Sequence, residues 1–129
     1  MMQFETCNEL CLRVTCDGQG TIFSKAGSWI GGQGSYNFEK VLLGPQGNPL
    51  QALFGQIGRR LTGENIPLMK TISHGQTVTY YAHKQRHVTV INLPVGQSIK
   101  VESEDLLAFN DACRYGLKPI GIGVISQKG

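Results

Sequence analysis

The sequence predicts a mainly β protein, an antiparallel β-sandwich or double-stranded β-helix with one short helix near residues 49–61. Apolar residues recur mostly at every second position, and glycine and proline interrupt the chain at short intervals. Short strands with such turns favour a sandwich or barrel over a parallel α/β sheet. The length of 129 residues suits a single domain, so we take residues 1–129 as one β-domain.

The first part of the chain is predicted to form short strands separated by glycine turns. In CLRVTC, residues 11–16, Leu12 and Val14 point to one face and the polar residues between them to the other. Further runs of strand formers, and the glycine-rich breaks between them, predict strands at 20–30 and 35–43 and turns at 17–20, 31–34 and 44–47.

The segment QALFGQIGRRLTGEN, residues 51–65, departs from the period of two. From Leu50 to Leu61 apolar residues recur at spacings of three and four, which indicates a helix packed on the sheet. Pro49 is tolerated in a first helical turn, and Gly63 suits a C-terminal stop.

The same segment resembles a phosphate-binding loop only in part. Such a loop needs a lysine after its second glycine, where it contacts the phosphates, but Glu64 follows Gly63 here. Arg59 and Arg60 remain candidate contacts for an anion, a neighbouring subunit or solvent.

The second part of the chain carries the stronger strand signals. Residues 66–82 predict a hairpin whose turn is His74-Gly75, with a positive φ at the glycine. Alternating or β-branched runs predict further strands at 86–93, 97–102, 105–110, 113–117 and 120–127.

The charge pattern does not favour a nucleic-acid binder. Twelve basic and nine acidic residues give a net charge of +3, and the longest basic cluster is Lys84-Gln85-Arg86-His87. An RNA- or nucleotide-binding module is therefore kept as an alternative, with Arg59, Arg60, Lys84 and Arg86 as its candidate contacts.

The histidines and cysteines do not match a known metal signature. His83 and His87 would lie about 13 Å apart along a strand, too far to share an ion. The spacing of Cys7, Cys11 and Cys16 is unlike the CxxC pairs of structural zinc sites. We predict neither metal nor cofactor, and we assign these cysteines no role beyond that of reduced thiols.

No catalytic motif is evident, and Trp29 has a structural interpretation. The sequence lacks a GxSxG nucleophile elbow and a recognisable Cys/His signature. Trp29 lies among glycines in KAGSWIGG and is a candidate anchor for a core or a subunit interface.

Neither a membrane span nor a secretory signal is predicted. No segment approaches the ~20 apolar residues that a membrane helix needs. The N-terminal residues carry Glu5 and Glu9 and lack a basic region followed by an apolar one, so we expect a cytoplasmic protein.

Several segments together resemble a known family. The segments FSKAGSWIGG, LFGQIGRRLTGEN, LPVGQSIKVESEDLLAF and GIGVISQKG occur in this order between Phe23 and Gly129. They resemble the family named for altered inheritance of mitochondria in yeast, which has many uncharacterised bacterial members. Its motifs match at 26–28, 59–64 and 93–108 of this chain.

The resemblance implies a fold and an arrangement, but no reaction. It implies a subunit like that of the tryptophan RNA-binding attenuation protein, a small β-sandwich or double-stranded β-helix that assembles through sheet edges. Family members usually carry two such domains, and this chain resembles the N-terminal half. The family offers no catalytic residues to carry over.

Our leading hypothesis is a non-enzymatic, oligomeric scaffold or binding module that self-associates through its sheet edges. The RNA- or nucleotide-binding module is the first alternative. A cupin-like metal or small-molecule enzyme is the second, and it requires histidine and glutamate side chains that converge in one pocket.

Overall fold

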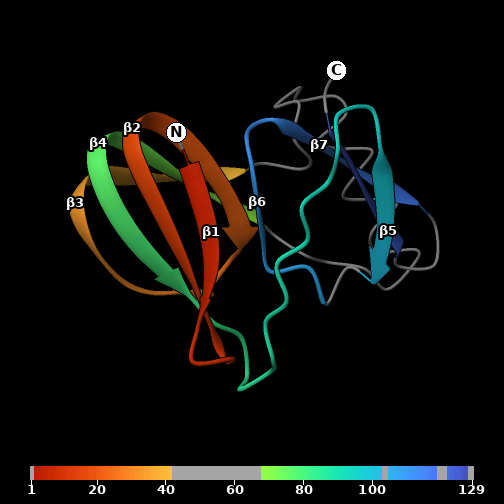
Figure 1. The fold of residues 1–129 in the computed structure, drawn as a ribbon, viewed down its shortest axis with the longest axis horizontal. Helices are drawn as coiled ribbons and strands as arrows, with labels where there is room; N and C mark the ends of the chain where they lie inside the picture. The colour runs from red at the N-terminus through yellow and green to blue at the C-terminus, as the bar shows by residue number, and fades with distance from the viewer. Residues whose placement is uncertain (1, 42–67, 103–104, 119–121, 128–129) are drawn as a thin grey trace.

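The computed structural model describes residues 2–41, 68–102, 105–118 and 122–127, which form two antiparallel β-sheets lying side by side (Figure 1). These residues contain no α-helix, and the prediction of a mainly β fold is confirmed. The helix predicted at 49–61 lies outside the described residues. Within the described part of the chain, no helix is long and apolar enough to cross a membrane.

The first sheet has the strand order β1-β2-β4-β3, with β6 also paired to β2, and the second has the order β5-β8-β7. The strands of the first sheet are β1 (Met2–Cys7), β2 (Cys11–Lys25), β3 (Trp29–Val41), β4 (Leu68–Tyr81) and β6 (Ala108–Asn110). Those of the second are β5 (Ser98–Glu102), β7 (Cys113–Lys118) and β8 (Ile122–Gln127).

Two strands share one edge of β2. The opposite edge pairs with β4 from Leu12 to Lys25. On the shared edge, β1 pairs with the first part of β2, as far as Cys16. Further along, β6 pairs with Ile22 to Ser24 and completes that edge.

A three-residue link forces the first sheet to curl. Strands β2 and β3 both run antiparallel to β4, and only residues 26–28 join them. Yet β2 ends opposite Leu68 and β3 begins opposite Tyr81, at the other end of β4. Those two residues would be about 43 Å apart in a straight strand, whereas the link spans about 14 Å at most. The sheet therefore curls until the two ends of β4 approach each other.

Hydrogen bonds close this curl at its ends. The phenol of Tyr81 donates to the Thr71 hydroxyl at 2.9 Å, although ten residues separate them along one strand. In the link, Gly27 has a φ of +85°, and the buried Ser28 hydroxyl donates to the Lys25 carbonyl at 2.6 Å. The Ser28 carbonyl accepts the Ala82 N–H at 2.9 Å, which ties the link to the end of β4.

The sheet bends sharply along one line that glycines mark. Gly18 of β2 lies opposite Gly75 of β4, and the register of β3 shifts beside them, after Gly34. On β4, the Ser73 and Thr77 hydroxyls lie 2.9 Å apart across this bend. Ser73 Oγ is also 2.9 Å from the Gly18 carbonyl oxygen and 2.8 Å from the Gly75 carbonyl oxygen. The Ser73 hydroxyl can therefore donate a hydrogen bond to either carbonyl.

The concave side of the curl is filled by small polar and apolar side chains together. Buried apolar positions of β2 face hydroxyl-bearing positions of β4: Val14 lies opposite Thr79, and Ile22 lies opposite Thr71. The buried polar side chains are Ser24, Ser28, Thr71, Ser73, Thr77 and Thr79. Small side chains suit this position because a strongly bent strand leaves little volume on its inner face.

Three predicted turns are wrong, since β2, β3 and β4 each continue through their glycines. Residues 17–20 lie within β2 and residues 31–34 within β3. The predicted hairpin at His74-Gly75 is instead the bend of β4, and Gly75 has no positive φ. Glycine permits a bend and a turn for the same reason, so local composition does not distinguish them. The strands predicted at 97–102, 113–117 and 120–127 are confirmed as β5, β7 and β8.

Gly34→Ala should destabilise the fold strongly. The backbone φ is +108°, and a Cβ there would lie 2.3 Å from the Gln76 carbonyl oxygen of the paired strand. We expect the free energy of unfolding to fall by about 2–4 kcal/mol, measured by urea denaturation. Gly18→Ala is the matched control, because open space surrounds that position and the loss should stay below about 1 kcal/mol. Equal losses in the two variants would contradict this description of the bend.

Tyr81 should make the free energy of unfolding decrease at alkaline pH. Burial raises the pKa of its phenol, although its hydrogen bond to Thr71 opposes the shift. The unfolded chain therefore ionises this group first, from about pH 10. The stabilisation that the neutral phenol of Tyr81 contributes is fully present below that pH. It is lost as the pH rises through the folded-state pKa. Tyr81→Phe should flatten this pH dependence in denaturant titrations between pH 9 and about 11. An unchanged slope in the variant would contradict the prediction.

Candidate functional site

A groove of about 660 Å³ lies between the two sheets and is half-open to solvent. Apolar side chains from three parts of the chain form its walls. The first wall comes from β1 and β2, the second from residues 86–93, and the third from β5 to β8. The apolar side chains of these walls include Met2, Phe4, Leu12, Val88, Val90, Ile91, Leu93, Ile99, Val101, Leu106, Leu107, Phe109 and Ile125.

A stack of aromatic rings joins the two sheets at this groove. The Phe109 ring lies 5.1 Å from that of Phe23 on β2 and 5.9 Å from that of Tyr115 on β7. Phe109 belongs to the first sheet through β6, but its ring is buried among Tyr115, Ile125 and Leu68. The stack is therefore the apolar contact that places the sheets against each other.

Residues 86–93 form a wall of the groove, but they do not form the predicted strand. The segment crosses in extended form from the first sheet to the second (Figure 1). Val88 and Val90 pack on the core of the first sheet, and Ile91 remains 57% exposed. The Val88 amide donates to the Glu9 carbonyl at 2.7 Å, and the described residues supply no other backbone partner for 88–93. The prediction of a strand is wrong. The β-branched residues of this segment favour an extended backbone, but they do not determine whether it pairs with another strand.

The candidate anion contacts do not come together in the described structure. Arg86 lines the groove and forms an ion pair with Asp105 at its rim. Lys84 is exposed in a tight turn, where its φ is +47°. Arg59 and Arg60 lie outside the described residues. A carboxylate thus already neutralises the guanidinium of Arg86, which weakens its attraction for a phosphate.

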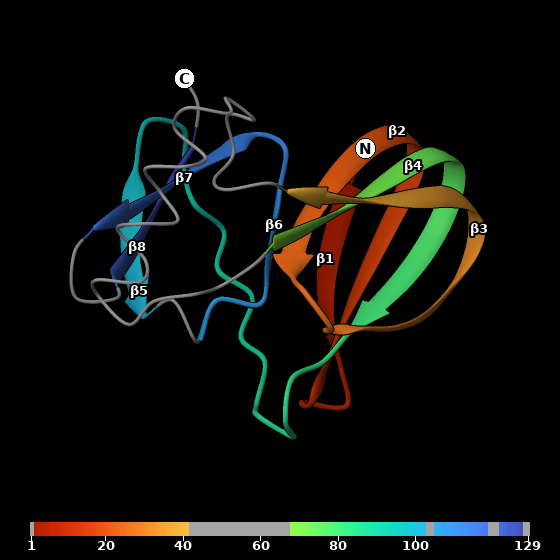
Figure 2. The ribbon, with the colours of Figure 1, turned by 180° about the vertical axis from the view of Figure 1, so that it is seen from behind.

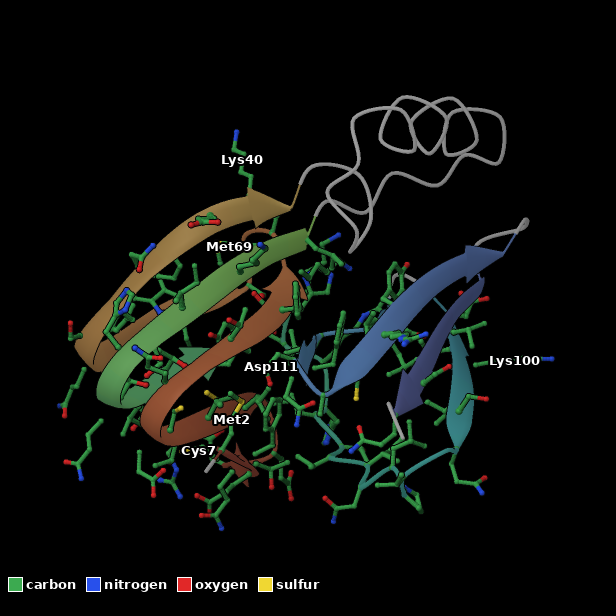
Figure 3. All side chains as sticks on the ribbon, turned by 90° about the horizontal axis from the view of Figure 1, so that it is seen from above. Met2, Cys7, Lys40, Met69, Lys100 and Asp111 are labelled. Atoms are coloured by element: carbon green, nitrogen blue, oxygen red, sulfur yellow. The ribbon has the colours of Figure 1, made fainter. Side chains whose placement is uncertain are left out.

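Other described cations are also paired. Arg13 lies 3.3 Å from Glu5 across the β1–β2 pair, and Lys70 lies 3.8 Å from Glu39 across β3 and β4. Lys40 on β3 and Lys100 on β5 point away from the sheets and from each other (Figure 3). The described surface therefore presents separated charges and not a basic stripe.

The histidines serve separate local contacts. His83 Nε2 lies 3.1 Å from the Lys25 ammonium, and His87 Nδ1 lies 3.9 Å from a carboxylate oxygen of Glu9. Among the described residues, no three His, Cys, Asp or Glu side chains lie close enough to hold a metal ion. The convergent histidine and glutamate set that a cupin-like enzyme requires is absent from this part of the chain.

Trp29 begins β3 and packs against aromatic residues of its own strand. Its ring centroid lies 5.2 Å from that of Phe38 and 6.3 Å from that of Tyr36, because β3 curls with the sheet. Trp29 is half-buried, and its indole Nε1 has no hydrogen-bond partner within the described structure. Phe38 and Ile30, also on β3, are 41% and 59% exposed.

The comparisons with known proteins decide the family. The family model of mitochondrial biogenesis AIM24 matches residues 4–129. The chain belongs to this family. The resemblance inferred from the sequence motifs is thereby confirmed. The search of curated proteins found no match to this AIM24-family protein.

A solved structure supports the fold. Protein SPYM3_0169 from Streptococcus pyogenes superposes with a TM-score of 0.52 at 15% sequence identity. The alignment covers 100% of this AIM24-family chain and 60% of the streptococcal chain, so the chain spans less than two thirds of the length of that protein. At this identity the likeness establishes the fold alone.

Sequence reasoning missed most of the groove. Phe109 was placed in a strand, but nothing in its neighbourhood indicated that its ring bridges two sheets. Strand β1, which supplies Met2 and Phe4, was not predicted either. The apolar residues Met2 and Phe4 alternate with the polar residues Gln3 and Glu5, which is a short strand signal for β1. No sequence signal indicates the pairing of Arg86 with Asp105, because the two residues are 19 positions apart in the chain.

Phe109→Ala should weaken the packing between the two sheets and destabilise the fold. The side chain is 6% exposed and touches rings on both sides, so we expect a loss of about 3–5 kcal/mol in the free energy of unfolding. Phe38→Ala is the matched control. Its ring also contacts two aromatic rings, but it is 41% exposed, and its loss should stay near about 1 kcal/mol. Chemical denaturation followed by fluorescence of Trp29 measures both, and similar losses would refute the bridging role.

Proposed function

We propose that this AIM24-family protein is a non-enzymatic, cytoplasmic β-module that assembles with further copies of itself through the edge strand β3. The observation that carries the proposal is the character of this edge. Among the described residues, strand β3 pairs with β4 on one side only, and its residues are largely exposed. It arches around the side of the first sheet that faces away from the second (Figure 2).

The chemistry of β3 suits pairing with another strand. Natural edge strands are usually protected by lysine, proline or inward-pointing charges. Residues 29–38, WIGGQGSYNF, contain no charge and no proline, and the charged residues Glu39 and Lys40 come only at the end of the strand. Exposed Ile30 and Phe38 add apolar area beside the backbone groups of this edge, which have no strand partner in the described part of the chain. Trp29 supports this edge from within, as an anchor of its aromatic cluster.

The proposal takes residues 1–129 as one domain that corresponds to the N-terminal half of a two-domain family member. In such a protein a second domain of the same kind would occupy this edge. Nucleic-acid binding draws no support from Arg13, Lys70 and Arg86, because each of these side chains contacts a carboxylate.

Ile30→Lys should shift the assembly towards monomer. A lysine at the paired edge places a charge in an interface that excludes water, so we expect the dissociation constant to rise by about 100-fold or more. Light scattering coupled to size-exclusion chromatography, over a range of protein concentrations, measures it. Ile91→Lys is the matched control, because Ile91 is 57% exposed against 59% for Ile30 but lies outside the strands.

Two results would refute the proposal. One is a wild-type protein that remains monomeric at a concentration of about 100 µM, where even weak specific pairs form. The other is an equal loss of assembly in the Ile30→Lys and Ile91→Lys variants. Circular dichroism should confirm that both variants keep their β structure.

A further inference from the structure

Two cysteines face each other across the β1–β2 hairpin. Cys7 and Cys11 are directly opposed Cα partners, and only residues 8–10 separate them. Asn8 and Glu9 have φ values of 55° and 71°, as a tight hairpin turn requires. Directly opposed residues have Cα atoms about 4.5–5.5 Å apart and side chains on the same face. A disulfide needs a Cα separation of about 4.4–6.8 Å. The hairpin backbone therefore places the two Cα atoms at a separation that a disulfide can span.

We propose that Cys7 and Cys11 form a reversible dithiol–disulfide site that reacts with low-molecular-weight disulfides. One cysteine thiolate attacks the small disulfide, forms a mixed disulfide and releases one small thiol. The second cysteine thiolate then attacks the protein sulfur of the mixed disulfide and releases the other small thiol. The two cysteines lose two electrons and two protons, and the small disulfide is reduced to two thiols.

Position and burial favour reaction at this pair, although the Cys11 thiol also donates a long hydrogen bond of 3.7 Å to the Leu12 carbonyl. Cys7 and Cys11 are half-buried at the end of an edge hairpin, and Figure 3 shows Cys7 on β1 near the outer boundary of the first sheet. Cys16, in contrast, is 1% exposed, and its thiol donates to the Gly18 carbonyl at 3.2 Å. Cys113 lies on β7, in the other sheet, and its thiol donates to the Gln127 side chain.

The acid–base chemistry of the pair gives the reaction a definite pH dependence. Burial raises the pKa of the Cys11 thiol above its ordinary value, and the charge of the neighbouring Cys7 raises it further. Because the thiolate is the attacking form, oxidation should accelerate as the pH rises from 7 towards about 9.

The hairpin turn is also connected to the groove. Between the two cysteines, the Glu9 carbonyl accepts the Val88 amide, and its carboxylate lies 3.9 Å from His87. Figures 1 and 2 both show the turn beside the segment that follows β4. A bond between Cys7 and Cys11 would restrict the turn that holds this segment in place. Oxidation should therefore slow hydrogen exchange at the Val88 amide.

Peptide mapping tests the proposal on the full chain. The reduced protein is incubated with oxidised glutathione, its remaining thiols are alkylated, and it is digested with trypsin. Cys7 and Cys11 fall together in the peptide of residues 1–13, because Arg13 is the first basic residue. We expect this peptide to lose both alkylation sites and two hydrogen atoms, to carry no glutathione, and to recover both thiols with a reducing agent.

Variants separate the pair from the other thiols. Cys7→Ser should leave Cys11 as a stable mixed disulfide with glutathione, whereas Cys113→Ser should leave the result unchanged. Two free thiols in peptide 1–13, two glutathione adducts on it, or a cross-link to Cys16 would each overturn the proposal. An unchanged exchange rate at Val88 after complete oxidation would overturn the connection to the groove. Neither readout depends on assembly through β3.

Discussion

The three-residue link between β2 and β3 is the constraint on which the rest of the structure depends. It joins two strands that run in the same direction, a task for which proteins normally use a crossover of a dozen residues or more. So short a link is possible only if the sheet curls until the ends of β4 meet, which the contact between Tyr81 and Thr71 demonstrates. The glycines at the bend and the hydroxyl groups inside it follow from this geometry. A bent backbone needs conformational freedom at the bend and small side chains on its inner face.

Patterns that depend on neighbouring residues could be predicted from the sequence, and patterns that depend on distant partners could not. The alternation in residues 97–102 and 113–127 is local, and these strands were found. The glycines near Gly18, Gly34 and Gly75 each predict a separate turn, because the local sequence around one glycine carries no information about the other two. Their alignment appears only when the three strands are paired. The motif around Ala26-Gly27-Ser28 was recognised as characteristic of the family, but its physical role as the closing link needed the structure.

The same distinction explains how little of the candidate site could be foreseen. Its walls come from residues at the N-terminus, from the middle of the chain and from the last strand, and no local motif joins them. Arg86 was selected for its charge, but its carboxylate partner comes from a different segment. A free cation and a neutralised one look alike in a sequence. The family match and the streptococcal structure extend the account of the fold, whereas the molecular role must come from the chemistry of particular side chains.

The shared edge of β2 has a consequence for the order in which the protein can fold during synthesis. Strand β1 and the first part of β2 are neighbours in sequence, so their hairpin can form soon after both leave the ribosome. The rest of that edge, from Ile22 to Ser24, pairs with a strand that ends at Asn110. Until then the nascent chain carries a half-completed sheet whose open edge can accept a wrong strand. Completion of the native sheet is thus a late event, and the interval before it is the period in which a chaperone would be of most use.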